Sequence, residues 1–164
     1  MISRGLVDEG LRVVESARLR HDGERRNPWN EPECGHHYAR ALSGWGPLLA
    51  LSGFLYNKPA GRLDAKPRIN AEAFTSFWSA GAGWGVFSHS VKEGRLHFTL
   101  AVKAGRLACR SVALGALVKA EGESSAAVGK TNVAHQARRT GEEIVVTFAE
   151  ELDLKEGDKL SLVV

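Results

Sequence analysis

The sequence has few cysteines, no long apolar run and no block of like charges, and each absence excludes a class of protein. Its 164 residues include two cysteines, Cys34 and Cys109. Two thiols are too few for a disulfide framework, so we expect both to be free. The longest apolar run lies around residues 47–51, far too short to span a membrane. The formal net charge of +3 is spread along the chain, so nucleic acid is not an expected partner.

The N-terminal residues also lack the apolar segment of a signal peptide, since Asp8 and Glu9 follow almost at once. We therefore expect a cytoplasmic protein. The composition, 43% hydrophobic and 25% charged, is that of a globular chain. A chain of this length can bury roughly 70% of its unfolded surface, so a substantial core is expected.

The first 53 residues are predicted to be helical. In residues 6–19, apolar side chains recur at the helical period, with Asp8 and Glu9 early and Arg18 late, as the helix dipole favours. A second helix is expected over residues 31–51, with a kink or restart at Pro47 because proline cannot donate to the preceding turn.

The remaining residues are predicted to form strands. Strict alternation over residues 96–102 is typical of a half-buried strand, and Lys103-Ala104-Gly105 is expected to turn the chain into a hairpin partner over residues 106–114. Residues 144–148 and 159–163 are two further expected strands. The predicted class is therefore α+β, with a helical segment over residues 1–53 and an antiparallel β-rich region over residues 54–164.

The densest group of chemically active side chains lies in residues 25–40. Glu31 and Glu33 would point about 200° apart on a helix, so they cannot form a facing pair of carboxylates. If Glu31 precedes the helix, its carboxylate and the Arg40 guanidinium could hold the hydroxyls of a pyranose, while Trp29 offers a ring face to the sugar's C–H side. The alternative is structural: Glu31 caps the helix and Arg40 forms a surface ion pair.

Two other chemistries would use side chains of the same segment. Cys34, His36 and His37 could ligate zinc, but no second pair of ligands with suitable spacing occurs elsewhere. A Cys34–His37 nucleophile pair lacks an orienting acid. We therefore expect neither a metal nor another cofactor.

The run from Asp22 to Arg40 reads Asp-Gly-Glu-Arg-Arg-Asn-Pro-Trp-Asn-Glu-Pro-Glu-Cys-Gly-His-His-Tyr-Ala-Arg, and continues through Trp45 to Leu-Ala-Leu-Ser-Gly-Phe at residues 49–54. This run resembles glycoside hydrolase family 116, which includes β-glucosidases and non-lysosomal glucosylceramidases. Residues 8–11 and the Gly-Trp-Gly at 83–85 also look like the C-terminal portion of that family. The resemblance is strongest between residues 5 and 90.

The resemblance implies that the helices are the last ones of an (α/α)6 barrel. Glu31 and Arg40 match positions that hold glucose hydroxyls at the cleavage subsite, and Trp29, Asn30 and Glu33 lie in the same loop. A retaining glycosidase needs two carboxylates about 5 Å apart, and in this family both lie upstream of the matched region. The resemblance therefore implies a C-terminal fragment that binds a β-glucoside-type carbohydrate, has no turnover of its own, and has the upstream part of the glycosidase as a partner.

Two further expectations concern apolar side chains. A fragment would leave Leu6, Val13, Leu48 and Leu49 exposed where the absent helices would cover them. The alternative function is a non-catalytic carbohydrate-binding or interaction module, with the region of Trp78 and Trp84 as its ligand platform. Core packing between the sheet and the helices is the structural explanation of those two tryptophans.

Overall fold

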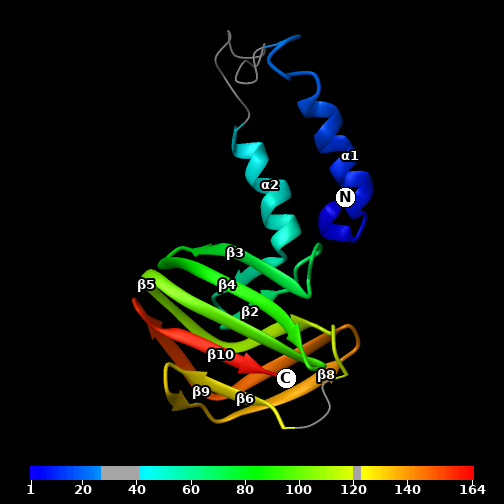
Figure 1. Cartoon of the computed structure of the whole chain (residues 1–164). Coiled ribbons are helices and arrows are strands. Elements are labelled where there is room, and N and C mark those ends of the chain that lie inside the picture. The colour runs from blue at the N-terminus through cyan, green and yellow to red at the C-terminus, as the bar shows by residue number, and fades with distance from the viewer. Residues whose placement is uncertain (27–40, 120–122) are drawn as a thin grey trace. The chain divides into compact units, whose positions relative to one another are not determined.

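The computed structural model describes residues 1–26, 41–119 and 123–164 (Figure 1). Contacts divide the chain into two compact units, Met1–Gly53 and Phe54–Val164. In the described residues the first unit holds two α-helices and the second holds ten strands. The predicted β-rich α+β class is therefore confirmed.

The helical unit consists of a short 3-10 helix, η1 (Ile2–Arg4), and two α-helices, α1 (Val7–Arg18) and α2 (Ala41–Ser52). The prediction for α1 is confirmed to within about a residue at each end. Ile2 packs directly on Gly10, where an added Cβ would lie 2.4 Å from Ile2 Cγ1. The end of α2 is also as predicted, and Pro47 lies within it; residues 31–40 of the expected second helix lie outside the described residues.

The helical unit leaves most of its described apolar side chains exposed. Ile2 is buried, at 6% exposure. The predicted exposure of Leu6, Val13, Leu48 and Leu49 is confirmed, because their exposed fractions range from 38% at Leu48 to 57% at Val13. Among the residues of this unit whose side chains are described, the exposed large apolar ones are Met1, Leu6, Val13, Leu19, Trp45, Leu48 and Leu49. Such faces stabilise a helix only when another apolar surface covers them.

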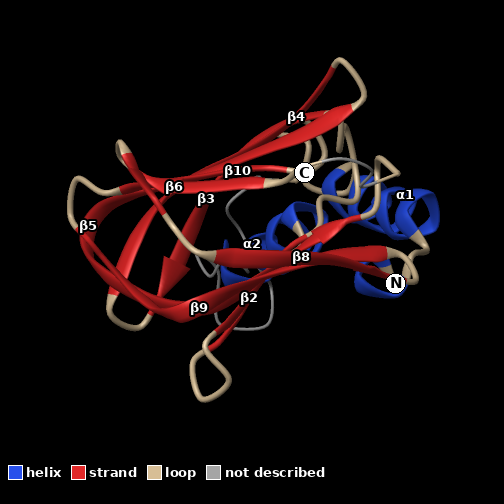
Figure 2. Ribbon diagram, turned by 90° about the horizontal axis from the view of Figure 1, so that it is seen from below, coloured by secondary structure: helices blue, strands red, loops and turns tan. Residues whose placement is uncertain are grey.

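The β unit has two layers of strands (Figure 2). Sheet A has the order β1-β2-β5-β9-β8, and sheet B has the order β3-β4-β5-β10-β6-β7. All pairs are antiparallel except β2 with β5, which is parallel. The strands are β1 Phe54–Asn57, β2 Arg62–Ala65, β3 Ala73–Ala80, β4 Gly83–Lys92, β5 Arg95–Gly115, β6 Ser125–Val128, β7 Thr131–Asn132, β8 His135–Thr140, β9 Glu143–Lys155 and β10 Lys159–Val163.

The predicted hairpin at residues 103–105 is wrong, because β5 continues through it as one strand of 21 residues. Gly105 has a φ of +76° and lies so close to β4 that an added Cβ would be 2.1 Å from the Ala82 carbonyl oxygen. The glycine therefore redirects the strand without reversing it. The first half of β5 pairs with β4 and β10, and the second half pairs with β2 and β9, so one strand joins the two layers.

The core of the β unit contains apolar side chains from both layers. Trp78, Phe87 and Phe98 are fully buried, and the ring of Phe54 lies 6.1 Å from Trp78 and 5.7 Å from Phe87. Rings at such separations pack favourably beyond the area they bury. The indole of Trp78 also donates a hydrogen bond of 3.1 Å to the carbonyl oxygen of Ala101.

The Gly83-Trp84-Gly85 sequence has a structural explanation in a close approach of β4 to β5. A Cβ at Gly85 would lie 1.9 Å from the Ala101 carbonyl oxygen and 2.7 Å from Trp78 Nε1. At Gly83 it would lie 2.7 Å from the backbone nitrogen of Arg106. The register of the pair also shifts between Trp84 and Gly85. The glycines thus allow the buried tryptophan to pack, whereas Trp84 itself is 52% exposed.

Candidate functional site

The five predicted sugar-binding residues, Trp29, Asn30, Glu31, Glu33 and Arg40, lie outside the described residues, as do Cys34, His36 and His37. The segment that leads into them is described as far as residue 26. There, Asp22 Oδ1 accepts hydrogen bonds from the backbone nitrogens of Arg25, at 2.8 Å, and Glu24, at 3.1 Å. These bonds, that from Arg25 foremost, lower the pKa of Asp22. Asp22 therefore forms a local turn, typical of aspartate in loops.

Within the β unit, the outer face of sheet A carries a network of four charged side chains. Along Arg62-Leu63-Asp64-Ala65-Lys66, charged and apolar residues alternate, so Leu63 and Ala65 are buried in the core and the three charged side chains share the other face. Glu143, at the start of β9, completes the network. The lysine ammonium lies 2.7 Å from Glu143 and 2.9 Å from Asp64, and Arg62 Nη2 lies 3.0 Å from Glu143 and 2.9 Å from Asp64.

Small residues on β5 explain how side chains on β2 and β9 meet. Strand β5 lies between the two, which places them about 10 Å apart. Ser111, Ala113 and Gly115 on β5 occupy the same face as the network, because they are in register with Thr147, Val145 and Glu143. Their short side chains leave room for the long arginine, lysine and glutamate side chains to bridge the middle strand.

The network keeps its four groups charged over a wide pH range. Burial alone would raise the pKa of Asp64, but its hydrogen bonds from Arg62 and Lys66 lower it overall. The hydrogen bond from Lys66 is the main reason that the pKa of Glu143 is lowered. Burial would lower the pKa of Lys66, yet bonding to both carboxylates raises it. The pKa of Arg62 is raised by its bonds to Asp64 and Glu143. The two positive and two negative charges cancel.

Replacing Glu143 by glutamine is expected to destabilise the β unit by about 1 kcal/mol, because two cations would then share the single carboxylate of Asp64. The loss is limited by solvent screening, since the arginine and lysine side chains are about a third exposed. Denaturant unfolding at low and high salt measures it, and the difference from the wild type should shrink at high salt. Glu150→Gln, an exposed position on the same strand, is the control; an equal loss there would contradict the assignment.

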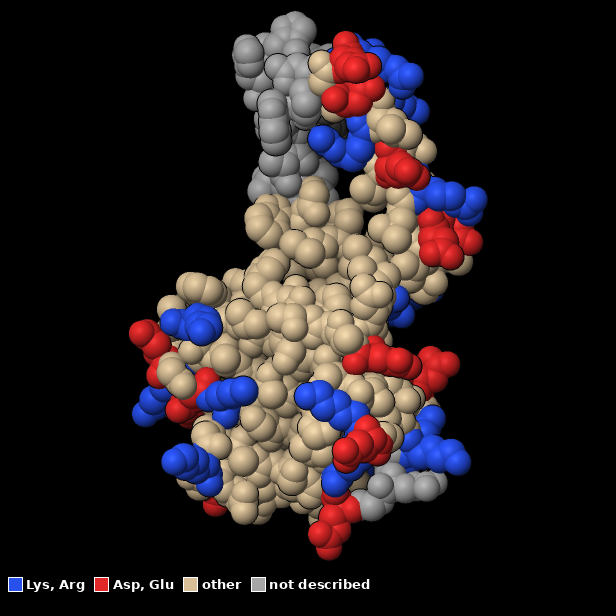
Figure 3. Space-filling model, viewed as in Figure 1, with Lys and Arg blue, Asp and Glu red and all other residues tan. Residues whose placement is uncertain are grey.

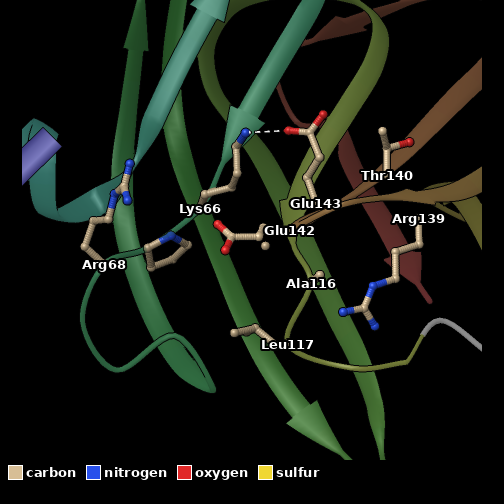
Figure 4. A pocket seen from close by; sticks show the side chains of 10 residues that line it. Lys66, Arg68, Ala116, Leu117, Arg139, Thr140, Glu142 and Glu143 are labelled. Carbon is tan, nitrogen blue, oxygen red and sulfur yellow. Dashed lines mark hydrogen bonds and ion pairs between the residues drawn. The ribbon is translucent and has the colours of Figure 1, made fainter. Parts of the chain in front are cut away.

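A hollow of about 760 Å³ lies at one end of this network (Figure 4). We call it the sheet A hollow; its lining residues are Lys66, Pro67, Arg68, Gly115, Ala116, Leu117, Arg139, Thr140, Glu142 and Glu143. In Figure 4 the side chains of Glu142, Arg139 and Leu117 lie around Ala116.

The β8–β9 turn and the end of β5 hold the hollow together. The backbone nitrogen of Ala116 donates to the Glu142 carbonyl oxygen at 3.0 Å. Arg139 donates from Nη1 to the Val118 carbonyl oxygen at 3.2 Å and from Nε to that of Gly141 at 3.4 Å. An ideal Cβ at Gly115 would meet no heavy atom within 4 Å, so space is open above it.

Two further titratable groups of the β unit, Cys109 and His89, are buried in its core. Burial raises the pKa of the Cys109 thiol to about 12, so it stays protonated and is a poor nucleophile. Burial lowers the pKa of His89 to about 4. In the described ranges no group of His, Cys, Asp and Glu side chains is placed to hold a metal ion. On the face that Figure 3 displays, acidic and basic side chains are interspersed.

No protein-family model matches the sequence, and a search among curated proteins finds no significant match. In the described parts of the chain no helix combines the length and the apolar character needed to cross a membrane. The sheet A hollow was not anticipated from the sequence. Its one recognisable signal is the charge alternation from Arg62 to Lys66, which indicates a strand with a charged outer face. Nothing in the sequence indicates that Glu143 and Arg139 line the hollow.

Proposed function

We propose that the chain contributes the sugar-binding part of a family 116-like β-glucosidase site, in which Glu31 and Arg40 hold the hydroxyls of a glucose unit. The observation that carries this proposal is the run from Asn27 to Arg40, which combines two carboxylates, the Arg40 guanidinium and the Trp29 ring in one short segment. A carboxylate accepts hydrogen bonds from hydroxyls and a guanidinium donates to them, so together they suit a pyranose.

The exposed apolar faces of the helical unit support this proposal. Leu6 and Val13 from the first helical segment, and Trp45, Leu48 and Leu49 from α2, are each at least 38% exposed. Helices that end an (α/α)6 barrel would bury such faces against the preceding helices. The proposal therefore includes a partner, the upstream region of the glycosidase, which would supply both the cover and the two catalytic carboxylates.

Binding of methyl β-D-glucoside to the full chain tests the proposed clamp. Glu31→Gln or Arg40→Lys should weaken binding at least tenfold, because each removes a charge-assisted or bidentate hydrogen bond. Titration calorimetry measures the affinity. Glu24→Gln is the matched control, since it changes a carboxylate of the same polar stretch outside the proposed clamp.

The same protein should not hydrolyse an aryl β-glucoside, because the proposal places both catalytic carboxylates in another part of the enzyme. Hydrolysis by the purified chain that disappears in Glu31→Gln would contradict that placement. Unchanged glucoside affinity in both clamp variants would contradict the clamp itself.

A second candidate is the carbohydrate-binding module, and the observation that favours it is the exposed indole of Trp84. This side chain stands beside Ser79 and Ala104 at the start of β4 in sheet B, framed by Gly83 and Gly85. A fixed, exposed ring can stack against the C–H face of a sugar. Trp78 cannot take part in such a platform, because it is fully buried.

A further inference from the structure

The lining of the sheet A hollow contains both hydrogen-bond donors and acceptors. Arg139 is held by two backbone carbonyls, and its guanidinium carries five N–H donors in all. Glu142 extends into the same space and offers carboxylate oxygens as acceptors (Figure 4). The hydroxyl of Thr140 can act in either role. Such a mixture matches hydroxyl groups, which are themselves both donors and acceptors.

The charges around the hollow argue against a strongly ionic ligand. Lys66 and Glu143 compensate each other at 2.7 Å, and Arg62 and Asp64 complete a neutral network beside them. A phosphate or sulfate entering the hollow would meet the carboxylate of Glu142 and that of Glu143. A polyamine would meet the three cationic side chains of the lining, Lys66, Arg68 and Arg139. A neutral polar ligand avoids both repulsions and can use both kinds of group.

An apolar strip completes the lining. Pro67, Ala116 and Leu117 line the hollow, and Leu117 is 39% exposed. The open space above Gly115 lets a ligand approach the backbone of β5. A pyranose has hydroxyls around its rim and C–H groups on its faces, so it can satisfy the polar and the apolar parts of this lining together.

We propose that the sheet A hollow binds a neutral saccharide, with Glu142 accepting hydrogen bonds from its hydroxyls, Arg139 donating to them and Leu117 contacting its C–H groups. This site lies in the β unit and does not depend on the proposed Glu31–Arg40 clamp. It also differs from the exposed surface around Trp84, which belongs to sheet B.

Amide chemical-shift mapping of the full chain tests the proposal. The probes are methyl β-D-glucoside, cellobiose and laminaribiose, with inorganic phosphate and spermidine as charged comparisons. At least one saccharide should shift the amides of residues 115–117 and 139–143. Glu142→Ala should lower the affinity for that saccharide at least tenfold. Glu150→Ala changes an exposed glutamate on β9 outside the hollow and should leave the affinity unchanged.

The proposal is overturned if no saccharide shifts these amides, if Glu142→Ala binds as tightly as the wild type, or if phosphate or spermidine shifts them more strongly than any saccharide. Shifts confined to residues 27–40 would overturn it while supporting the glucose clamp. Shifts in residues 115–117 and 139–143 that persist in Glu31→Gln would support the hollow whatever becomes of the clamp. The two proposals can therefore fail separately.

Discussion

Replacing Trp78 with alanine is expected to lower the free energy of unfolding of the β unit by about 3–5 kcal/mol. The side chain is fully buried, so its removal leaves a cavity that the rigid sheet can fill only in part. The change also removes the ring contact with Phe54 and leaves the Ala101 carbonyl oxygen without the indole hydrogen bond of 3.1 Å. Denaturant unfolding followed by far-ultraviolet circular dichroism measures the loss.

The matched control is Trp84→Ala, a second tryptophan six residues along the chain and on the neighbouring strand. Trp84 is 52% exposed, so its replacement should change stability by no more than about 0.5 kcal/mol. A similar loss at both positions would show that Trp84 also packs in a core. It would then not be available as the exposed ring of a carbohydrate-binding module.

The second large effect is a pH dependence that comes from His89. This side chain is 2% exposed and packs edge-on against Phe98, with ring centroids 5.3 Å apart. Burial lowers the pKa of His89 from 6.5 to about 4; the Ala65 backbone favours the charged form too weakly to offset this. Among the described residues neither ring nitrogen makes a well-formed hydrogen bond. The folded protein therefore holds the ring neutral.

The sign follows from the two pKa values. Between 6.5 and about 4 the unfolded chain binds a proton at His89 that the folded protein does not, so stability falls as the pH falls through this window. From about pH 7 to about pH 5 the loss should be about 2 kcal/mol. The carboxylates of Asp64 and Glu143, whose ordinary values are 3.8 and 4.5, add their own loss mainly at lower pH.

His89→Leu should flatten this part of the profile, because leucine cannot take up a proton. It should also equal or exceed the wild type in stability near pH 5, since it removes two buried nitrogens that lack good hydrogen bonds. Thermal or denaturant unfolding at several pH values measures both effects. A profile as steep in His89→Leu as in the wild type would assign the pH dependence to other groups.

The predicted hairpin failed for a reason specific to long-range pairing. Lys103-Ala104-Gly105 carries a turn signal, and local reasoning takes Gly105 as the point of reversal. The same glycine allows a bend within one continuous strand when both halves of that strand pair with other strands. Here β4 and β10 pair with one half and β2 and β9 with the other, so continuation of β5 satisfies more backbone hydrogen bonds than reversal would.

The sequence by itself determined the elements whose signal is local. The period of residues 6–19 specified α1, and the alternation of residues 96–102, 144–148 and 159–163 specified strands with one buried face. It also gathers Trp29, Glu31 and Arg40 in one short segment, which is the basis of the proposed glucose clamp.

Tertiary structure alone decided which residues from distant strands meet. Two tryptophans six residues apart have opposite fates, Trp78 in the core and Trp84 at the surface, because the β3–β4 register pairs Trp78 with Gly85 on the buried face and leaves Trp84 on the other face. Glu143 joins Arg62, 81 positions earlier in the sequence, because small side chains on β5 let both reach across it. Neither outcome is encoded in a local period; each depends on how the strands pair.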